Sequence, residues 1–177
     1  AHAEAFPDAL LIVDEAFADA HPETSLLDGG ELPRNIVVLR SFGKFYGLAG
    51  VRLGFVITAH AIGKTLADTA GDWSLSGPAI TLGTRALNDH DWAAANRAKL
   101  ALQSQKLDSL LSDAGLAIVG GTSLFRSMRS TATLEMFEKL SQVGILVRPL
   151  KDLTALRFGI PANEVQLESL ISALHSG

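Results

Sequence analysis

The sequence predicts an α/β fold, in which part of a mostly parallel sheet is followed by a smaller α+β region. Two short apolar runs, residues 10–13 and 36–39, predict strands, and the first is typical of a strand that is buried on both faces of a parallel sheet. These runs alternate with loops and helix-like segments, as they do in α/β proteins. Hydrophobic residues make up 47% of the chain and charged residues 19%, so the 177 residues can fill a core in one or two domains.

The first part of the chain contains three expected strands, one loop and two expected helices. The strands are residues 10–13, 36–40 and 51–57. A polar loop, Pro22 to Pro33, separates the first two strands. The helices are residues 59–70 and 78–88. Pro78 suits the first turn of the second helix, because a proline there loses no helical hydrogen bond.

A long helix is expected next, capped by Asp91 and ending at Gly115. Apolar residues recur on one of its faces at helical spacing, namely Leu100, Leu107, Leu110, Leu111 and Ala114. This helix, about residues 91–114, links two expected domains that cover residues 1–95 and 96–177.

The second domain is expected to combine four short strands with two helices. The strands are residues 117–119, 124–128, 145–147 and 155–158. The first helix carries an apolar stripe and ends at Gly144; the stripe is Leu134, Phe137, Leu140 and Val143. The second helix begins at Asn163 with Gln166 as a capping-box partner, and its stripe is Leu167, Leu170, Ile171 and Leu174. Both stripes predict core packing.

The composition argues against several classes of protein. The net charge is −4 and Lys and Arg form no run, so nothing indicates a nucleic-acid or membrane-surface partner. Without cysteine the chain has no disulfide and no thiolate chemistry, and its five histidines lack ligand spacing, so we expect no metal site. No apolar run approaches the ~20 residues that span a bilayer, and no signal peptide is visible, which makes the cytoplasm the default location.

The segment from Arg40 to Gly54 carries the strongest chemical signal. A lysine in a glycine-punctuated turn, such as Lys44, can be desolvated and is then partly a neutral, nucleophilic amine. Ser41 precedes it and Arg52 follows it, and these two side chains can grip a phosphate, Arg52 in bidentate fashion. An amine beside a phosphate grip is what pyridoxal phosphate (PLP) requires. Taken alone, such a lysine is more often a solvated loop residue.

Asp14 ends the first expected strand. Carboxylates at the carboxyl end of a central strand point into the crevice where open α/β sheets bind ligands. Next to a pyridine nitrogen, Asp14 keeps the ring protonated and able to accept electrons. The alternative is that Asp14 and Glu15 merely end a strand.

Arg157 lies within an apolar segment, Leu156 to Pro161. An arginine in such a segment is costly to bury unless it is paired. Arg157 is therefore expected either to bind an anionic ligand or to form an internal salt bridge.

The lysine segment resembles the cofactor-lysine motif of fold-type I PLP-dependent enzymes, the aminotransferase superfamily. The matching positions are Ser41, Lys44, Leu48, Ala49, Gly50, Arg52 and Gly54. The resemblance implies that the chain is the C-terminal part of a fold-type I large domain, followed by a small α+β domain.

The same resemblance implies a role for each candidate residue. Lys44 is the catalytic residue and holds PLP, Asp14 pairs with the ring nitrogen, and Ser41 and Arg52 bind the cofactor phosphate. Arg157 binds the α-carboxylate of the substrate.

Two positions depart from the family pattern. Gly43 stands where many members of the histidinol-phosphate aminotransferase branch carry a serine, and Phe17 stands where the family has a tyrosine that hydrogen-bonds the 3-oxygen of the ring. With Phe17, four segments make the chain similar to the threonine-phosphate decarboxylases of cobalamin biosynthesis, namely Asp14–His21, Trp73–Pro78, Gly120–Arg126 and Leu156–Pro161.

This similarity implies a PLP-dependent decarboxylation of L-threonine O-3-phosphate to 1-amino-2-propanol phosphate. The alternative is an aminotransferase of the histidinol-phosphate type, which uses the same groups on a small amino-acid phosphate. Members of the family are homodimers with active sites at the subunit interface.

Family members begin much further upstream than Ala1. Their first half carries the aromatic ring that stacks on the cofactor and the glycine-rich helix start that binds its phosphate. The chain is therefore expected to be a C-terminal half that lacks activity alone. The alternative from a different class of function is that the chain is a binding or dimerisation module without catalytic activity.

Overall fold

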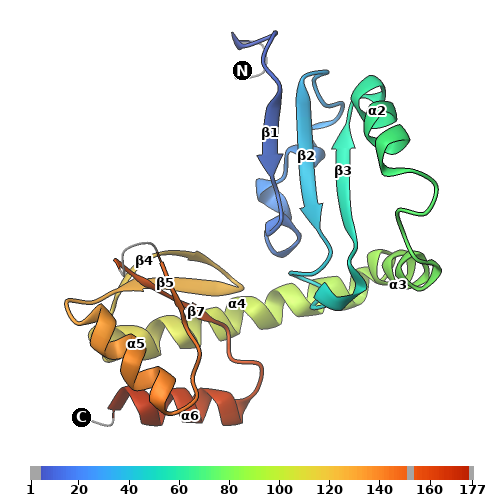
Figure 1. Cartoon of the computed structure of the whole chain (residues 1–177). Coiled ribbons are helices and arrows are strands. Elements are labelled where there is room, and N and C mark those ends of the chain that lie inside the picture. Colours follow the sequence, from blue (N-terminus) through green and yellow to red (C-terminus); the bar gives the residue numbers. More distant parts are fainter. Residues whose placement is uncertain (1–4, 151–153, 176–177) are drawn as a thin grey trace. The chain divides into compact units, whose positions relative to one another are not determined.

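The computed structural model describes residues 5–150 and 154–175 (Figure 1). The chain divides into two compact units, Ala1–Ala93 and Ala94–Gly177. Each unit has its own sheet, which supports a mixed α/β architecture.

The sheet of the first unit contains β1 (Leu11–Asp14), β2 (Ile36–Ser41) and β3 (Gly54–Thr58), in that order. β1 and β2 are parallel, whereas β2 and β3 are antiparallel. The expectation of a mostly parallel sheet therefore holds for only one of the two described pairings. β3 runs back along β2 because the chain between them folds into turns and provides no crossover helix, which a parallel pairing requires.

Two details of this sheet correct the sequence-based expectations. β3 begins at Gly54 rather than at residue 51, because Ala49–Val51 forms a 3₁₀ turn that leads into Arg52. β1 is not buried on both faces, since the side chain of Ile12 is 64% exposed.

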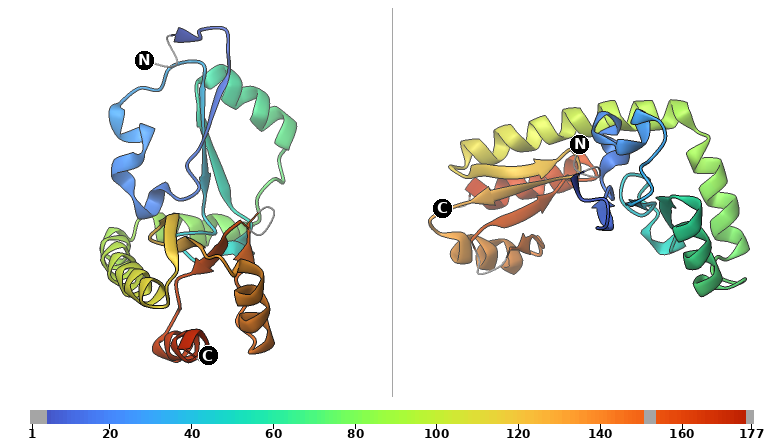
Figure 2. Two further views of the ribbon diagram at one scale, coloured as in Figure 1. Left: turned by 90° about the vertical axis from the view of Figure 1, so that its left-hand side faces the viewer. Right: turned by 90° about the horizontal axis from the view of Figure 1, so that it is seen from above.

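Helices and turns flank this sheet on two sides, as the left view of Figure 2 shows. On one side lies α2 (His60–Ala70), and on the other lie the 3₁₀ turns of residues 18–29. The expected polar loop after Pro22 thus contains regular turns. Leu27 and Leu32 from this segment pack against Val38 of β2, whose side chain is fully buried.

The two helices that follow begin with side-chain caps. α3 (Gly77–Leu87) is capped by the Ser76 hydroxyl, which accepts a hydrogen bond from Ala79 N at 3.2 Å. α4 (His90–Asp113) begins one residue before the predicted cap Asp91. Its cap is Asp89, whose carboxylate accepts a hydrogen bond from Trp92 N at 3.0 Å. Asp89 stands three residues before the amide from which its carboxylate accepts this hydrogen bond, and that is the spacing of an N-cap.

The sheet of the second unit is antiparallel throughout, with the order β4-β5-β7-β6. Its strands are β4 (Ala117–Thr122), β5 (Phe125–Arg129), β6 (Arg148–Pro149) and β7 (Leu156–Gly159). The predicted strand over residues 145–147 was wrong. Val147 instead packs into the core, and pairing with β7 begins only at Arg148.

One face of this second sheet forms a core with three helices, α4, α5 (Thr133–Gln142) and α6 (Glu164–His175). The most buried members of this core include Leu107, Leu111, Met128, Leu140 and Phe158. The expected stripes are confirmed only in part. Leu140 and Leu170 lie in the core, and Phe137 and Leu174 pack against it, whereas Leu134, Val143 and Ile171 are exposed. The predicted cap of α6 is confirmed, since Asn163 Oδ1 accepts a hydrogen bond from Gln166 N at 2.9 Å.

The described residues contain no helix that is long and apolar enough to cross a membrane. They also contain no cluster of His, Asp and Glu side chains that could hold a metal ion.

Candidate functional site

The carboxyl ends of β1 and β2 lie at the same edge of the first sheet, because these strands are parallel (Figure 1). Asp14 ends β1 opposite Leu39, and Ser41 ends β2 two residues later. Paired residues on neighbouring strands point to the same face, and so do residues two apart along a strand. Asp14, Leu39 and Ser41 therefore share one face, which we call the site face.

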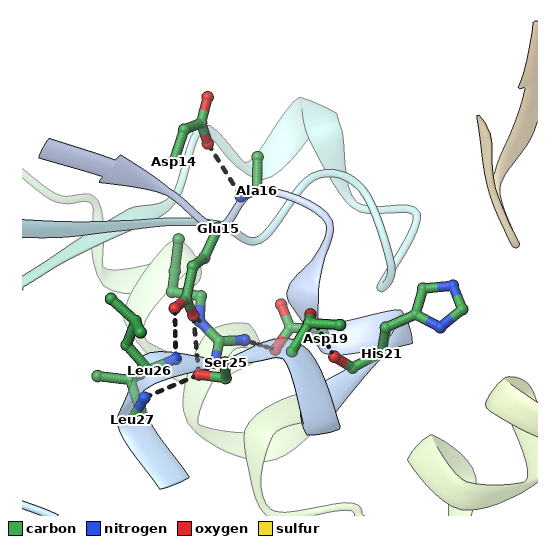
Figure 3. A network of polar contacts seen from close by, with 10 residues as sticks. Asp14, Glu15, Ala16, Asp19, His21, Ser25, Leu26 and Leu27 are labelled. Atoms are coloured by element: carbon green, nitrogen blue, oxygen red, sulfur yellow. Dashed lines mark hydrogen bonds and ion pairs between the residues drawn. The ribbon is translucent and has the colours of Figure 1, made fainter. Parts of the chain in front are cut away.

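Asp14 is exposed on the site face, and its Oδ1 accepts a hydrogen bond from Ala16 N at 2.9 Å. Glu15 points the other way, toward the turns of residues 25–27, as Figure 3 shows. The two neighbouring carboxylates thus have different surroundings. Glu15 is an internal partner of the fold, whereas Asp14 is available to a ligand.

A cavity of about 310 Å³ begins where β2 ends. Its lining residues are Arg40, Ser41, Gly43, Lys44, Ala49, Arg52, Leu53 and Gly54. Three of these carry cationic side chains, none carries a carboxylate, and one carries a hydroxyl. This donor set suits a phosphate, so the structure brings Ser41, Lys44 and Arg52 together as the spacing of the motif suggested.

The turn that carries Lys44 is held by its neighbours in the sequence. Phe42 and Phe45 are buried on either side of it, and their rings pack with Tyr46 at centroid distances of 4.8 and 5.1 Å. Gly43 has no room for a side chain, because a Cβ there lies 2.8 Å from the Cα of Ala49. Gly43 therefore stands in place of the serine at a point where the backbone of Ala49 comes too close for any side chain.

Lys44 itself is exposed, and its Nζ lies 5.8 Å from the centroid of the Phe17 ring. The desolvation expected for this lysine is not provided by the described residues of its unit. Phe17, which stands in place of the family's tyrosine, offers the lysine an aromatic ring but no hydroxyl.

Arg52 has a left-handed backbone, with a φ of 58°. It is the one non-glycine residue with a positive φ among those that the structure describes. Its Nη1 donates a hydrogen bond to Ala49 O at 3.2 Å, and its side chain is exposed. Such a backbone is unfavourable for a residue with a side chain; residues of this kind occur in turns and cluster at functional sites, and Arg52 ends the 3₁₀ turn Ala49–Val51.

Arg157 lies in the second unit, on β7. Leu156 and Phe158 beside it point into the core, so Arg157 occupies the opposite face of the sheet. Its guanidinium carbon lies 4.8 Å from the centroid of the Phe125 ring. No carboxylate among residues 5–150 and 154–175 forms an ion pair with it, so the described part of the chain does not provide the salt bridge that was the alternative.

Arg148 is a further candidate that the sequence pattern does not indicate. It stands directly opposite Arg157 on the neighbouring strand β6, so the two side chains share a face. Like charges directly opposite each other destabilise a sheet unless an anion lies between them. The pairing depends on the register of β6, which no local pattern in the sequence indicates.

Comparison with known proteins identifies the family of the chain. Residues 2–174 match the family described as aminotransferase class I and II. The chain is 38% identical over 164 residues to the threonine-phosphate decarboxylase of Pseudomonas aeruginosa, which covers 93% of this chain and 49% of that protein. It is 32% identical over 182 residues to the histidinol-phosphate aminotransferase of Symbiobacterium thermophilum, covering 97% and 50%.

A solved structure agrees with the fold. Histidinol-phosphate aminotransferase from Sinorhizobium meliloti, in complex with pyridoxal-5'-phosphate, matches with a TM-score of 0.83 at 24% identity, over 93% of this chain and 47% of that one. The chain thus spans about half the length of the curated relatives it matches.

Proposed function

The chain belongs to the aminotransferase class I and II family, and on that premise we propose that the intact protein is a PLP-dependent enzyme that decarboxylates L-threonine O-3-phosphate. The observation that carries the proposal is the convergence of Ser41, Lys44 and Arg52 on one cavity at the edge of the sheet where Asp14 also lies. Relatives named threonine-phosphate decarboxylase, at 38% and 41% identity, support the substrate.

Each residue of the first unit has a distinct task in this proposal. Pyridoxal phosphate, when bound, supplies an aldehyde that links to amines and a ring that accepts electrons from a breaking bond. Lys44 would hold the cofactor through its amine, and its exposed position leaves room for the amine of a substrate beside it. Arg52 and Ser41 bind the phosphate by charge-assisted hydrogen bonds. Asp14, exposed at the end of β1, would pair with the ring nitrogen and favour its protonated form.

The second unit supplies the contacts to substrate in this proposal. Arg157 binds the α-carboxylate, and the planar fork of its guanidinium matches the two carboxylate oxygens. Arg148, directly opposite, binds a second anionic group of the same substrate, and a phosphorylated amino acid carries one. A substrate with two anionic groups would also explain why Arg148 and Arg157 lie opposite each other although no carboxylate of the described residues forms an ion pair with either.

The domain roles are part of the same proposal. Residues 1–95 belong to the cofactor-binding domain and residues 96–177 to the small domain, with the linking helix at about residues 91–114. The intact protein acts as a homodimer. Its substrate is a small molecule.

An aminotransferase of the histidinol-phosphate type is the second candidate. It uses the same side chains, but it breaks the Cα–H bond and passes the amino group to a keto acid. In the decarboxylase the bond between Cα and the carboxylate carbon breaks, carbon dioxide leaves and a proton replaces it on Cα. The higher identity to the decarboxylase, 38% against 32%, favours the first reaction.

A product assay on the intact protein separates the two reactions. The protein is loaded with PLP and incubated with carboxyl-labelled L-threonine O-3-phosphate, with and without a keto-acid acceptor. Release of labelled carbon dioxide without the acceptor, together with 1-amino-2-propanol phosphate, is the expected result. Product that forms only when the acceptor is present, with no carbon dioxide, identifies the aminotransferase instead.

The 177-residue chain assayed alone provides a second arm. Because Asp14, Lys44 and Arg52 are exposed in it, water competes for each of their contacts with the cofactor, and we expect no turnover. Turnover equal to that of the intact protein would show that these residues bind the cofactor and support catalysis without being shielded from water by further chain.

A further inference from the structure

A cluster of buried charges lies directly behind the site face. Arg40 Nη1 donates a hydrogen bond to Asp19 Oδ1 at 2.8 Å, and its Nη2 donates one to Ser25 Oγ at 2.9 Å. Its Nε lies 3.1 Å from Glu15 Oε2, at ion-pair distance. Glu15 also accepts hydrogen bonds from the Ser25 hydroxyl at 2.8 Å and from Leu26 N at 2.7 Å (Figure 3).

The burial of this cluster calls for an explanation. The side chain of Glu15 is 5% exposed, that of Arg40 15% and that of Asp19 18%. Taking three charges out of water is costly, and well-packed apolar residues often give the same stability or more. In several proteins, buried polar or ionic groups fix one arrangement of the chain at a cost in stability. The question is therefore which arrangement the cluster fixes.

The position of the cluster in the sequence gives the answer. Glu15 directly follows Asp14, and Arg40 directly precedes Ser41. Because side chains alternate along a strand, Arg40 and Ser41 point to opposite faces of the sheet. Each charged partner behind the sheet is thus one residue away from a candidate ligand of the cofactor on the site face.

The cluster also joins the two strand ends to each other. Glu15 N donates a hydrogen bond to Leu39 O at 2.9 Å, which extends the pairing of β1 and β2 by one residue. The side-chain pair between Glu15 and Arg40 makes a second link at the same level. One link lies in the plane of the sheet and the other lies behind it, so twisting either strand end strains at least one of them.

Arg40 lines the same cavity as Ser41, Lys44 and Arg52, so the alternative to a positioning role is that Arg40 itself binds the cofactor phosphate. Each of the three guanidinium nitrogens of Arg40 already faces an oxygen of Glu15, Asp19 or Ser25. Two carboxylates also offset its single charge. Arg40 is therefore poorly suited to bind an anion itself.

We propose that Arg40, held by Glu15 and Asp19, is a positioning residue that sets the spacing between Asp14 and Ser41 and thereby the affinity for PLP. This inference rests on the proposed PLP site. It assigns to the buried cluster an effect on cofactor affinity that is separate from its effect on folding.

The test is the dissociation constant of PLP, measured on the intact protein by the quenching of tryptophan fluorescence, at a temperature at which thermal unfolding curves show every variant folded. Glu15→Gln gives opposite results under the two explanations. If Arg40 contacted the phosphate, removing a nearby negative charge would tighten binding. Under the positioning role we expect binding about tenfold weaker, the lower end of what lost outer partners cost in metal sites.

Arg40→Lys also separates the positioning role from direct phosphate binding. The lysine keeps the positive charge but cannot contact Glu15, Asp19 and Ser25 at once. We expect it to weaken binding as much as Glu15→Gln does. The matched control is Asp108→Asn, which removes the partner of Arg126 in the second unit, where the exposure of the arginine is the same. It is expected to lower the melting temperature without changing the affinity for PLP.

The outcomes separate this inference from the proposed function. A parent protein that binds no PLP at Lys44 refutes the proposed function. A parent that binds PLP while Glu15→Gln and Arg40→Lys bind it equally well, or more tightly, refutes the positioning role alone. If Glu15→Gln does not fold, Asp19→Asn decides in its place, since it removes one contact and leaves the pair of Glu15 and Arg40. Unchanged affinity in that variant also overturns the inference.

Discussion

The left-handed backbone of Arg52 allows stability and cofactor binding to be separated by one substitution, Arg52→Gly. The φ of 58° is unfavourable for a residue with a side chain and neutral for glycine. The exposed guanidinium lines the cavity that we assign to the cofactor phosphate. The substitution therefore removes backbone strain and the phosphate contact together.

The expected magnitudes follow from these two features. A left-handed backbone costs an L-residue roughly 1–2 kcal/mol. Against this, glycine destabilises by about 0.4–1 kcal/mol through the unfolded chain. The exposed hydrogen bond from Arg52 to Ala49 O contributes about 0.5 kcal/mol. The free energy of unfolding should therefore change by about 1 kcal/mol or less. Loss of a charge-assisted contact costs about 1.5–3 kcal/mol, so the affinity for PLP should fall roughly tenfold to hundredfold.

Arg34→Gly is the matched control, because Arg34 is exposed and has no positive φ. It should lose about 0.4–1 kcal/mol without relief of strain and should bind PLP normally. Urea unfolding reports stability through Trp92, whose ring stacks on that of Tyr46 at 5.7 Å. Trp73 adds little change to this signal because it is already 95% exposed.

Two results would refute the reasoning. If Arg52→Gly were less stable than Arg34→Gly, the left-handed backbone would not be a source of strain. If Arg52→Gly bound PLP as tightly as the parent, the phosphate would be held by other residues. A loss of affinity with stability retained is the expected combination.

Four further predictions test the other residues. Lys44→Ala should abolish the PLP adduct that borohydride fixes on the protein and mass spectrometry detects; an adduct that persists would overturn the role of Lys44. Gly43→Ser should lower the free energy of unfolding by about 1–3 kcal/mol through overpacking, measured in urea, whereas Gly50→Ser, which has no neighbour within 4 Å of its Cβ, should not. Arg157→Gln should raise the KM for the substrate about tenfold or more at an unchanged affinity for PLP, and an unchanged KM would remove it from the substrate site. Leu140→Ala, at a fully buried position of the second core, should cost about 2–5 kcal/mol by denaturation, and a smaller loss would mean that this core collapses around the gap.

The local part of the fold could be predicted from the sequence because local chemistry decides it. The apolar run before Asp14 forms β1, and Ser76 caps α3 with Pro78 in its first turn. Asn163 and Gln166 cap α6, as their spacing indicates. The lysine segment could be recognised because its residues are close in the sequence and resemble a family motif, and the structure brings Ser41, Lys44 and Arg52 to one cavity.

The tertiary structure decided which distant segments meet. The antiparallel return of β3, the exposure of Ile12 and the burial of Glu15 depend on partners more than ten residues away, so no pattern within a short window reports them. The same is true of Arg148 opposite Arg157. The sequence by itself therefore determined which residues have the chemistry for a PLP site. Only the pairing of strands determined which of the charged residues lie on the site face and which lie behind it, because a one-residue step along a strand moves a side chain from one face of the sheet to the other.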